Sequence, residues 1–165
     1  MRRIPVLAIA FLLLAAGCGG SDGSNGRAYE PSKSPTASTL IDYGDDGITV
    51  ANAADADKLT GAPDDFEAFI VADLQRQQDS KDEGCAETPE IHVAKIDTRG
   101  WAAGGSFIPQ CGGNAALWAK VAGGWREVWG GQTLPDCAVL EKFRFPATIA
   151  GTECGTADGG THRYP

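Results

Sequence analysis

The chain has few of the residues on which most metal and nucleophile chemistry depends. Of its 165 residues only His92 and His162 are histidines, and after Leu40 the only serines are Ser80 and Ser106. No two cysteines stand two to four positions apart, the spacing of structural zinc ligands. The motifs Gly-x-Ser-x-Gly, Ser-x-x-Lys and His-Glu-x-x-His do not occur after Leu40. The sequence therefore predicts no metal site, no cofactor and no familiar hydrolase centre.

Positive charge is scarce as well. The chain has 14 Lys and Arg residues against 22 Asp and Glu residues, and a formal net charge of -8. This balance argues against a nucleic-acid partner and against a polybasic attachment to anionic lipid. No apolar run beyond the first 18 residues reaches the length of a membrane-spanning helix.

The first residues have the layout of a secretory signal peptide. Met1-Arg2-Arg3 is positively charged, residues 6–16 are an unbroken apolar run, and small residues lead up to Cys18. The apolar run is too short to span a bilayer as a finished helix. We therefore expect residues 1–17 to be removed, which deletes two arginines and moves the formal charge from -8 to -10.

Ala15-Ala16-Gly17-Cys18 resembles the lipobox of bacterial lipoproteins, with Ala15 where leucine is most usual. The resemblance implies a diacylglyceryl (palmitate-type) group on the Cys18 thiol, attachment to the cell membrane and display on its extracytoplasmic face. Two acyl chains hold a protein on a membrane stably, whereas one binds reversibly. The alternative is an ordinary signal peptide with a cysteine at its end. With their Gly/Ser-rich continuation, residues 1–39 resemble the small lipoproteins of high-GC Gram-positive bacteria.

The next segment, 18–39, is rich in glycine, serine, proline and threonine and has almost no apolar residues. Such a composition cannot offset the entropy of ordering, so we expect a disordered tether. A single domain is predicted over residues 40–165, with a loose tail over 155–165. No family is recognised in this part.

The domain is predicted to be α+β. A helix is expected from Pro63 to about Gln78, with acidic residues in its first turn and an apolar stripe at Phe66, Phe69, Ile70 and Leu74. Four strands are expected at 91–96, 101–107, 115–121 and 125–129, followed by a short helix that starts near Pro135 and ends at Pro146. The result is a small antiparallel sheet of about four strands, with one longer and one short helix on one face.

Four cysteines remain in the domain once Cys18 is assigned to lipid. An even number in an exported chain favours disulfides, and three pairings exist. Cys85 and Cys111 lie just beyond the open end of the predicted 91–107 hairpin, so we expect Cys85–Cys111 and Cys137–Cys154.

The second hairpin contains the most suggestive side chains. If Gly123-Gly124 is its turn, Lys120 lies opposite Glu127 and Trp118 opposite Trp129, which places Trp118, Trp125 and Trp129 on one face. On an exposed face these rings, with Lys120 and Glu127, would bind a sugar ring or an apolar patch of a partner. A register shifted by one residue pairs Trp125 with Val121 and Trp129 with Leu117, and sends both rings into the core.

The residues that could support catalysis or bind a metal ion are weaker candidates than this aromatic surface. A triad of Ser106, His92 and Asp97 or Asp82 conflicts with the strand pairing, which places His92 opposite Gly105. The acidic groups Asp42, Asp45, Asp46, Asp55 and Asp57 do not follow the EF-hand order and are expected to be a solvated surface. We therefore expect a non-catalytic module that binds an envelope protein or a cell-wall glycan. A small envelope hydrolase using His92 with a carboxylate, and a structural or stress-related envelope protein, are the alternatives.

Overall fold

The computed structural model describes residues 39–80 and 84–165, which belong to one compact unit. The predicted signal peptide, Cys18 and all of the predicted tether except Thr39 lie outside the described residues. No helix of the described residues is long and apolar enough to cross a membrane. The elements follow in the order β1 (Leu40–Asp42), β2 (Ile48–Val50), η1 (Ala53–Lys58), α1 (Asp64–Asp79), β3 (Glu90–Asp97), β4 (Trp101–Ile108), β5 (Gly112–Val121), β6 (Gly124–Gly131), α2 (Cys137–Phe143), α3 (Ala147–Ala150), β7 (Glu153–Gly155) and β8 (Thr161–Arg163).

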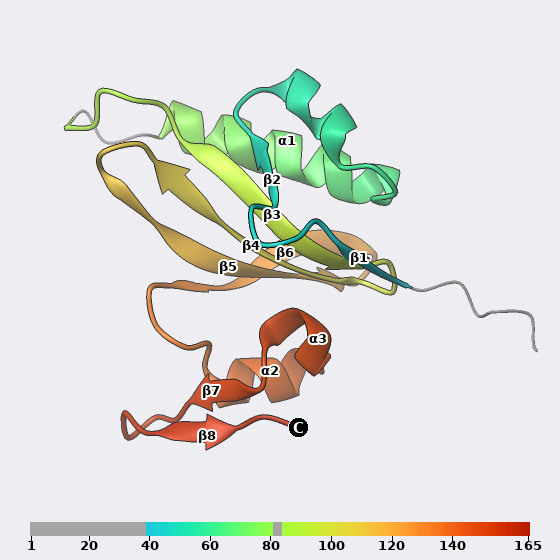
Figure 1. Ribbon diagram of the computed structural model, residues 1–165, viewed down its shortest axis with the longest axis vertical. Helices are drawn as coiled ribbons and strands as arrows, with labels where there is room; N and C mark the ends of the chain where they lie inside the picture. The colour runs from blue at the N-terminus through green and yellow to red at the C-terminus, as the bar shows by residue number, and fades with distance from the viewer. Residues whose placement is uncertain (1–38, 81–83) are drawn as a thin grey trace, which may run out of the picture. The chain divides into compact units, whose positions relative to one another are not determined.

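Within the described ranges, six strands form one antiparallel sheet (Figure 1). Strands β3 to β6 pair in sequence order, while β1 and β2 both pair with the free side of β3. The α+β class and the antiparallel sheet are confirmed, but the predicted count of about four strands is wrong. β1 and β2 have three residues each, too few for an alternating pattern to be recognised in the sequence.

Helix α1 confirms the strongest local prediction. It begins at Asp64 with Pro63 as its N-cap, one position later than expected, and three acidic residues stand in its first turn. Phe66, Ile70 and Leu74 are buried, so the apolar stripe faces the sheet. The core on this face consists of Val50, Leu59, Phe66, Ile70, Leu74, Ile91, Val93, Ile96, Ala102, Ala116, Trp118 and Trp125.

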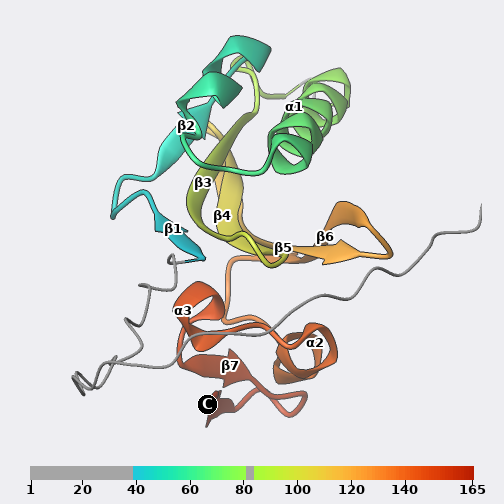
Figure 2. The ribbon, with the colours of Figure 1, turned by 90° about the vertical axis from the view of Figure 1, so that its right-hand side faces the viewer.

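The opposite face of the sheet is covered as well (Figure 2). Helices α2 and α3 and the β7–β8 pair lie there, so the prediction that the helices share one face is wrong. The residues 116–119 of β5 are all buried, because consecutive side chains enter cores on opposite faces. The second core consists of Leu117, Ala119, Leu140, Phe145, Ile149, Cys154 and Tyr164.

The C-terminal residues are ordered, contrary to the predicted loose tail. β7 and β8 pair antiparallel, and Tyr164 directly after β8 is buried. The Tyr164 hydroxyl donates to the backbone oxygens of Phe145 at 2.7 Å and Leu140 at 3.2 Å. A single buried ring with a satisfied hydroxyl anchors a segment whose composition alone indicates disorder.

Both expected disulfides are present. Cys85–Cys111 joins the loop after α1 to the β4–β5 turn, with 6.1 Å between the Cα atoms. Cys137–Cys154 joins the start of α2 to β7, with 4.9 Å between the Cα atoms. The second bond joins two elements of the small C-terminal layer, α2 and β7.

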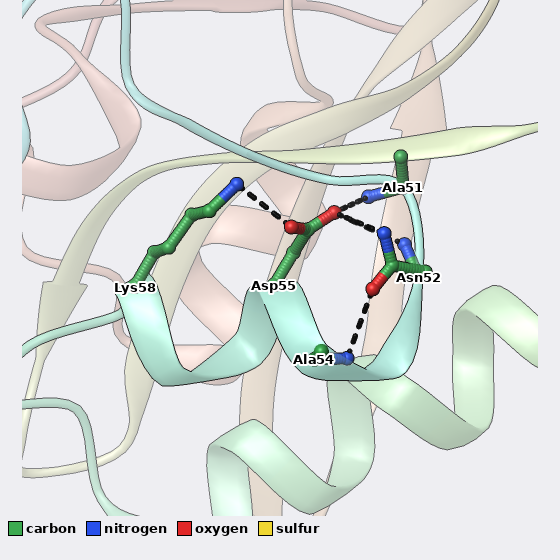
Figure 3. A network of polar contacts seen from close by, with 5 residues as sticks. All are labelled: Ala51, Asn52, Ala54, Asp55 and Lys58. Carbon is green, nitrogen blue, oxygen red and sulfur yellow. Dashed lines mark hydrogen bonds and ion pairs between the residues drawn. The ribbon is translucent and has the colours of Figure 1, made fainter.

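A polar network caps the start of the short helix η1 (Figure 3). Asn52 Oδ1 accepts a hydrogen bond from the Ala54 amide, and Asp55 Oδ2 accepts from the amides of Ala51 and Asn52. Lys58 Nζ lies 2.7 Å from the other Asp55 oxygen. Lys58 and these amides hold the pKa of Asp55 below its usual range. Asp55, predicted to be part of a solvated acidic surface, is therefore a helix-capping residue.

Candidate functional site

The second hairpin turns one residue earlier than predicted. Val121 pairs with Gly124, so Ala122 and Gly123 are the two turn residues, and both have positive φ, at 52° and 85°. These are the angles of a primed two-residue turn, which matches the twist of the strands. Lys120 consequently lies opposite Trp125, and the predicted Lys120–Glu127 pairing is wrong.

A bulge then separates the tryptophans. The pairing shifts between Leu117 and Trp118, so that Trp118 lies opposite Glu127 while Trp129 lies opposite Leu117. An extra residue on one strand sends the side chains that follow it to the opposite face of the sheet. Trp118 and Trp125 therefore share the face of α1, and Trp129 packs with the core on the other face. The predicted common face of three tryptophans does not exist.

Trp118 and Trp125 hold α1 on the sheet. Trp118 is 1% exposed and Trp125 is 9% exposed. Their rings meet Phe66 edge to face, with centroids 6.1 Å and 4.7 Å away. The Trp125 indole donates to Asp65 Oδ1 at 3.1 Å, and Lys120 forms an ion pair with Asp65. Lys120 and Trp125 hold the pKa of Asp65 below its usual range.

The other two tryptophans hold the C-terminal layer. Trp101 is half-buried and its indole donates to the Phe143 backbone oxygen at 2.8 Å. Trp129 is half-buried in the same core. All four tryptophans of the chain thus serve packing, two on each face of the sheet.

The predicted exposed surface of three tryptophans is therefore not formed. The alternative register placed Trp125 and Trp129 in the core. Trp129 does lie opposite Leu117 and is half-buried, whereas Trp125 is buried but lies opposite Lys120 and not Val121.

Glu127, the last residue of the predicted surface, lies at the edge of the α1 face. The Glu127 carboxyl lies close to the backbone of its own strand, β6. A Cβ added at Gly130 would lie 2.5 Å from the Glu127 Oε1 atom. Burial raises the pKa of this carboxyl, and Arg76 of α1 partly opposes the effect. Arg76 also forms an ion pair with Asp73, which is buried. Lys120 forms its ion pair with Asp65 of α1 and not with Glu127.

The alternative triad is not assembled. His92 pairs with Gly105, as predicted, whereas Ser106 pairs with Ile91 and its hydroxyl donates to Asn114 Oδ1 at 3.0 Å. Adjacent positions of a strand point to opposite faces, so His92 and Ser106 do not meet. Asp82 lies outside the described residues. Within those residues, no three His, Cys, Asp or Glu side chains gather as metal ligands.

Asp97 has a structural partner in place of a catalytic one. It is 1% exposed and accepts from the Arg99 amide at 3.0 Å, from Nε at 2.9 Å and from Nη2 at 2.6 Å. These contacts with Arg99 hold the pKa of Asp97 below its usual range. The carboxylate therefore fixes the turn between β3 and β4.

Replacing Asp97 by asparagine is expected to destabilise the domain in a pH-dependent way. A carboxyl whose pKa is lowered on folding stabilises the fold above its unfolded pKa of about 3.9, and this contribution is lost as pH falls through the folded pKa. The free energy of unfolding of Asp97→Asn should fall by about 1–3 kcal/mol at neutral pH, with a smaller difference near pH 3. Urea denaturation at both pH values measures this, with Asp45→Asn in an exposed turn as the matched control. An equal loss at both pH values would show that the charge is not responsible.

A hollow lies between η1 and α1, which run side by side in Figures 1 and 2. Its volume is about 620 Å³. Small apolar side chains form most of its lining, namely Ala53, Ala56, Ala68, Val71 and Ala72. On α1 these residues form a second stripe beside the core-facing one. Their spacing could have indicated the groove, but alanines give too weak an apolar signal to distinguish a groove from solvent.

Three carboxylates, Asp57, Asp64 and Glu67, also line this groove. Among the described residues none of the three forms an ion pair, and Lys58 and Lys120 pair with Asp55 and Asp65. The charge of Glu67 also reaches Tyr43, whose pKa is raised first by burial and then by this carboxylate. The η1–α1 groove therefore has an apolar lining and uncompensated negative charge.

Comparison with known proteins adds no relative. The chain matches no family model, and no curated protein or solved structure is significantly similar to it.

Proposed function

We propose that the chain is a lipid-anchored envelope protein. In this proposal residues 1–17 are a signal peptide, Cys18 bears the lipid, and residues 18–39 separate the domain from the membrane. The lipobox-like residues before Cys18 motivate it. The disulfides Cys85–Cys111 and Cys137–Cys154 support it, since such bonds persist mainly in oxidising compartments outside the cytoplasm.

We further propose that the displayed domain is a non-catalytic module that binds a protein partner in the η1–α1 groove. The observation behind this proposal is the combination of an alanine lining with three unpaired carboxylates. A wall glycan is the weaker candidate, because stacking on a sugar ring needs an exposed aromatic face and the tryptophans are occupied in packing.

The lining of the groove favours a partner segment that is basic and has small side chains. Alanine side chains allow another backbone to approach α1 closely, and lysine or arginine side chains would reach the carboxylates at the rim. Each rim pair contributes about 0.2–1 kcal/mol and mainly raises the association rate. A helix with lysines on its flanks and alanines on its contact face fits this description, in the helix-in-groove mode of recognition.

Charge reversal in the groove tests this proposal. The double variant Asp57→Lys with Asp64→Lys is expected to weaken binding of a fluorescent lysine/alanine helical peptide about tenfold, which corresponds to about 1.4 kcal/mol. Fluorescence anisotropy measures it on the full chain reconstituted in uncharged lipid vesicles. Asp45→Lys with Asp46→Lys changes the net charge equally at an exposed turn outside the groove. Equal weakening by both double variants would mean that only net charge attracts the peptide.

A further inference from the structure

The two disulfides of the domain differ in how far they are open to solvent. Cys111 is exposed in the turn between β4 and β5, and its partner Cys85 is half-buried in the loop after α1. Cys154, in contrast, is 0% exposed in β7, and its partner Cys137 is half-buried at the start of α2. Thiol–disulfide exchange begins when a thiolate attacks one sulfur atom, so its rate depends on access to the bond. The first bond is therefore the more accessible to a reductant.

The surroundings of the two bonds differ in the same sense. Cys154 is a member of the core between the sheet and the C-terminal layer, and Cys137 packs against that core. Neither Cys85 nor Cys111 belongs to the two cores that residues 39–80 and 84–165 form. The Cys137–Cys154 bond is thus part of the apolar packing of its layer, whereas the Cys85–Cys111 bond lies outside both cores.

The segments that the accessible bond joins also have contacts of their own. Gln78, near the end of α1, donates through Nε2 to the backbone oxygens of Ala51 and Pro89 at 3.1 and 3.2 Å. Pro89, directly before β3, is buried. In the β4–β5 turn the Cys111 amide donates to the Ile108 oxygen at 2.9 Å. The end of α1, the start of β3 and the turn are therefore held by contacts that do not involve the sulfur atoms.

We propose that Cys85–Cys111 is a reversible redox switch at the surface of the domain, with a dithiol as its reductant, whereas Cys137–Cys154 is a permanent structural bond. One thiolate of the dithiol attacks the Cys111 sulfur, and the electron pair of the broken S–S bond leaves with the Cys85 sulfur, which takes up a proton. The second thiolate of the dithiol then attacks the sulfur of its neighbour in the mixed disulfide and releases Cys111 as a thiolate, which is protonated. The dithiol becomes a disulfide, and two electrons and two protons pass to the cysteines.

Reduction changes a limited part of the domain. The loop around Cys85 is released from the turn around Cys111, while α1 and the sheet keep the contacts described above. Two thiols then stand at the surface, where an oxidant can join them again. This switch involves neither the η1–α1 groove nor the lipid anchor, so it does not depend on the proposed function.

Timed reduction of the full chain by dithiothreitol, in uncharged detergent, tests the proposal. Samples are quenched with iodoacetamide, and mass measurement of peptides reports the alkylation of each cysteine, which distinguishes the four from Cys18. The Cys85–Cys111 pair is expected to be alkylated at least about tenfold faster than the other pair, since a buried bond is reached only when its layer opens locally. Tryptophan emission should stay native at that stage, and oxidised glutathione should restore the bond.

Two double variants are matched controls. Cys85→Ser with Cys111→Ser should keep the native tryptophan emission. Cys137→Ser with Cys154→Ser should lose part of it, because two of the tryptophans pack against the core that contains this bond. Equal reduction rates, earlier reduction of the buried bond, loss of native emission together with the accessible bond, or native emission in the second variant would each overturn the proposal.

Discussion

Replacing Cys18 by alanine is expected to abolish lipid attachment and cleavage of the chain. In the proposed lipoprotein the Cys18 thiol is the acceptor of the diacylglyceryl group, and the lipid-modified cysteine becomes the first residue after cleavage. Alanine has no thiol that could be acylated, and cleavage follows acylation in the proposed lipoprotein, so neither product should form. Metabolic labelling with an alkyne analogue of palmitate, followed by intact mass measurement, should show an unlabelled and uncut chain.

The other cysteines supply the control for this experiment. The pair Cys85→Ala and Cys111→Ala removes two thiols that are joined in a disulfide. This double variant should still be labelled and cut, although its domain is less stable. Label remaining in the Cys18→Ala chain would contradict the lipoprotein proposal. A wild-type chain cut at Cys18 but without label would point to an ordinary signal peptide.

Replacing Phe66 by alanine is expected to remove a large part of the stability of the domain. Phe66 is 0% exposed and contacts both Trp118 and Trp125 edge to face. Truncating a buried phenylalanine costs about 3–5 kcal/mol, and the net stability of a domain is about 5–15 kcal/mol. The loss should be large because the ring lies where α1, β5 and β6 meet. Urea denaturation followed by tryptophan fluorescence measures it.

Phe107→Ala is the matched control for Phe66→Ala. Phe107 is 48% exposed on β4, so the same truncation there should change the free energy of unfolding by less than about 0.5 kcal/mol. Similar losses in the two variants would show that the Phe66 ring does not seat α1 on the sheet. Because Trp125 is in contact with Phe66, its emission should also shift to longer wavelength in the Phe66→Ala variant.

The role of the four tryptophans could not be predicted from the sequence alone. Two registers of the β5–β6 hairpin were consistent with the residues, and they led to opposite roles for the same rings. The structure follows neither register throughout, because the turn uses Ala122 with positive φ and a bulge follows near Leu117. A non-glycine residue in a left-handed conformation leaves little trace in a sequence. The η1–α1 groove was missed because its alanine lining gives only a weak pattern in the sequence.

Local interactions determined the features that the sequence alone predicts well. The apolar stripe of α1, its acidic first turn, the hairpin strands and the two disulfide pairings follow from contacts between near neighbours or from one simple topology. The processing and lipidation at Cys18 also depend on a short local motif and stay a prediction.

The tertiary structure alone decided which face of each strand is covered and which carboxylates remain without partners. Lys120 could pair with Glu127 or Asp65, and only the docking of α1 selects Asp65. The Asp55 carboxylate caps η1, whereas Asp57, two positions later, lines the η1–α1 groove. Charge and burial depend on distances between elements, and such distances are set by packing across the whole domain.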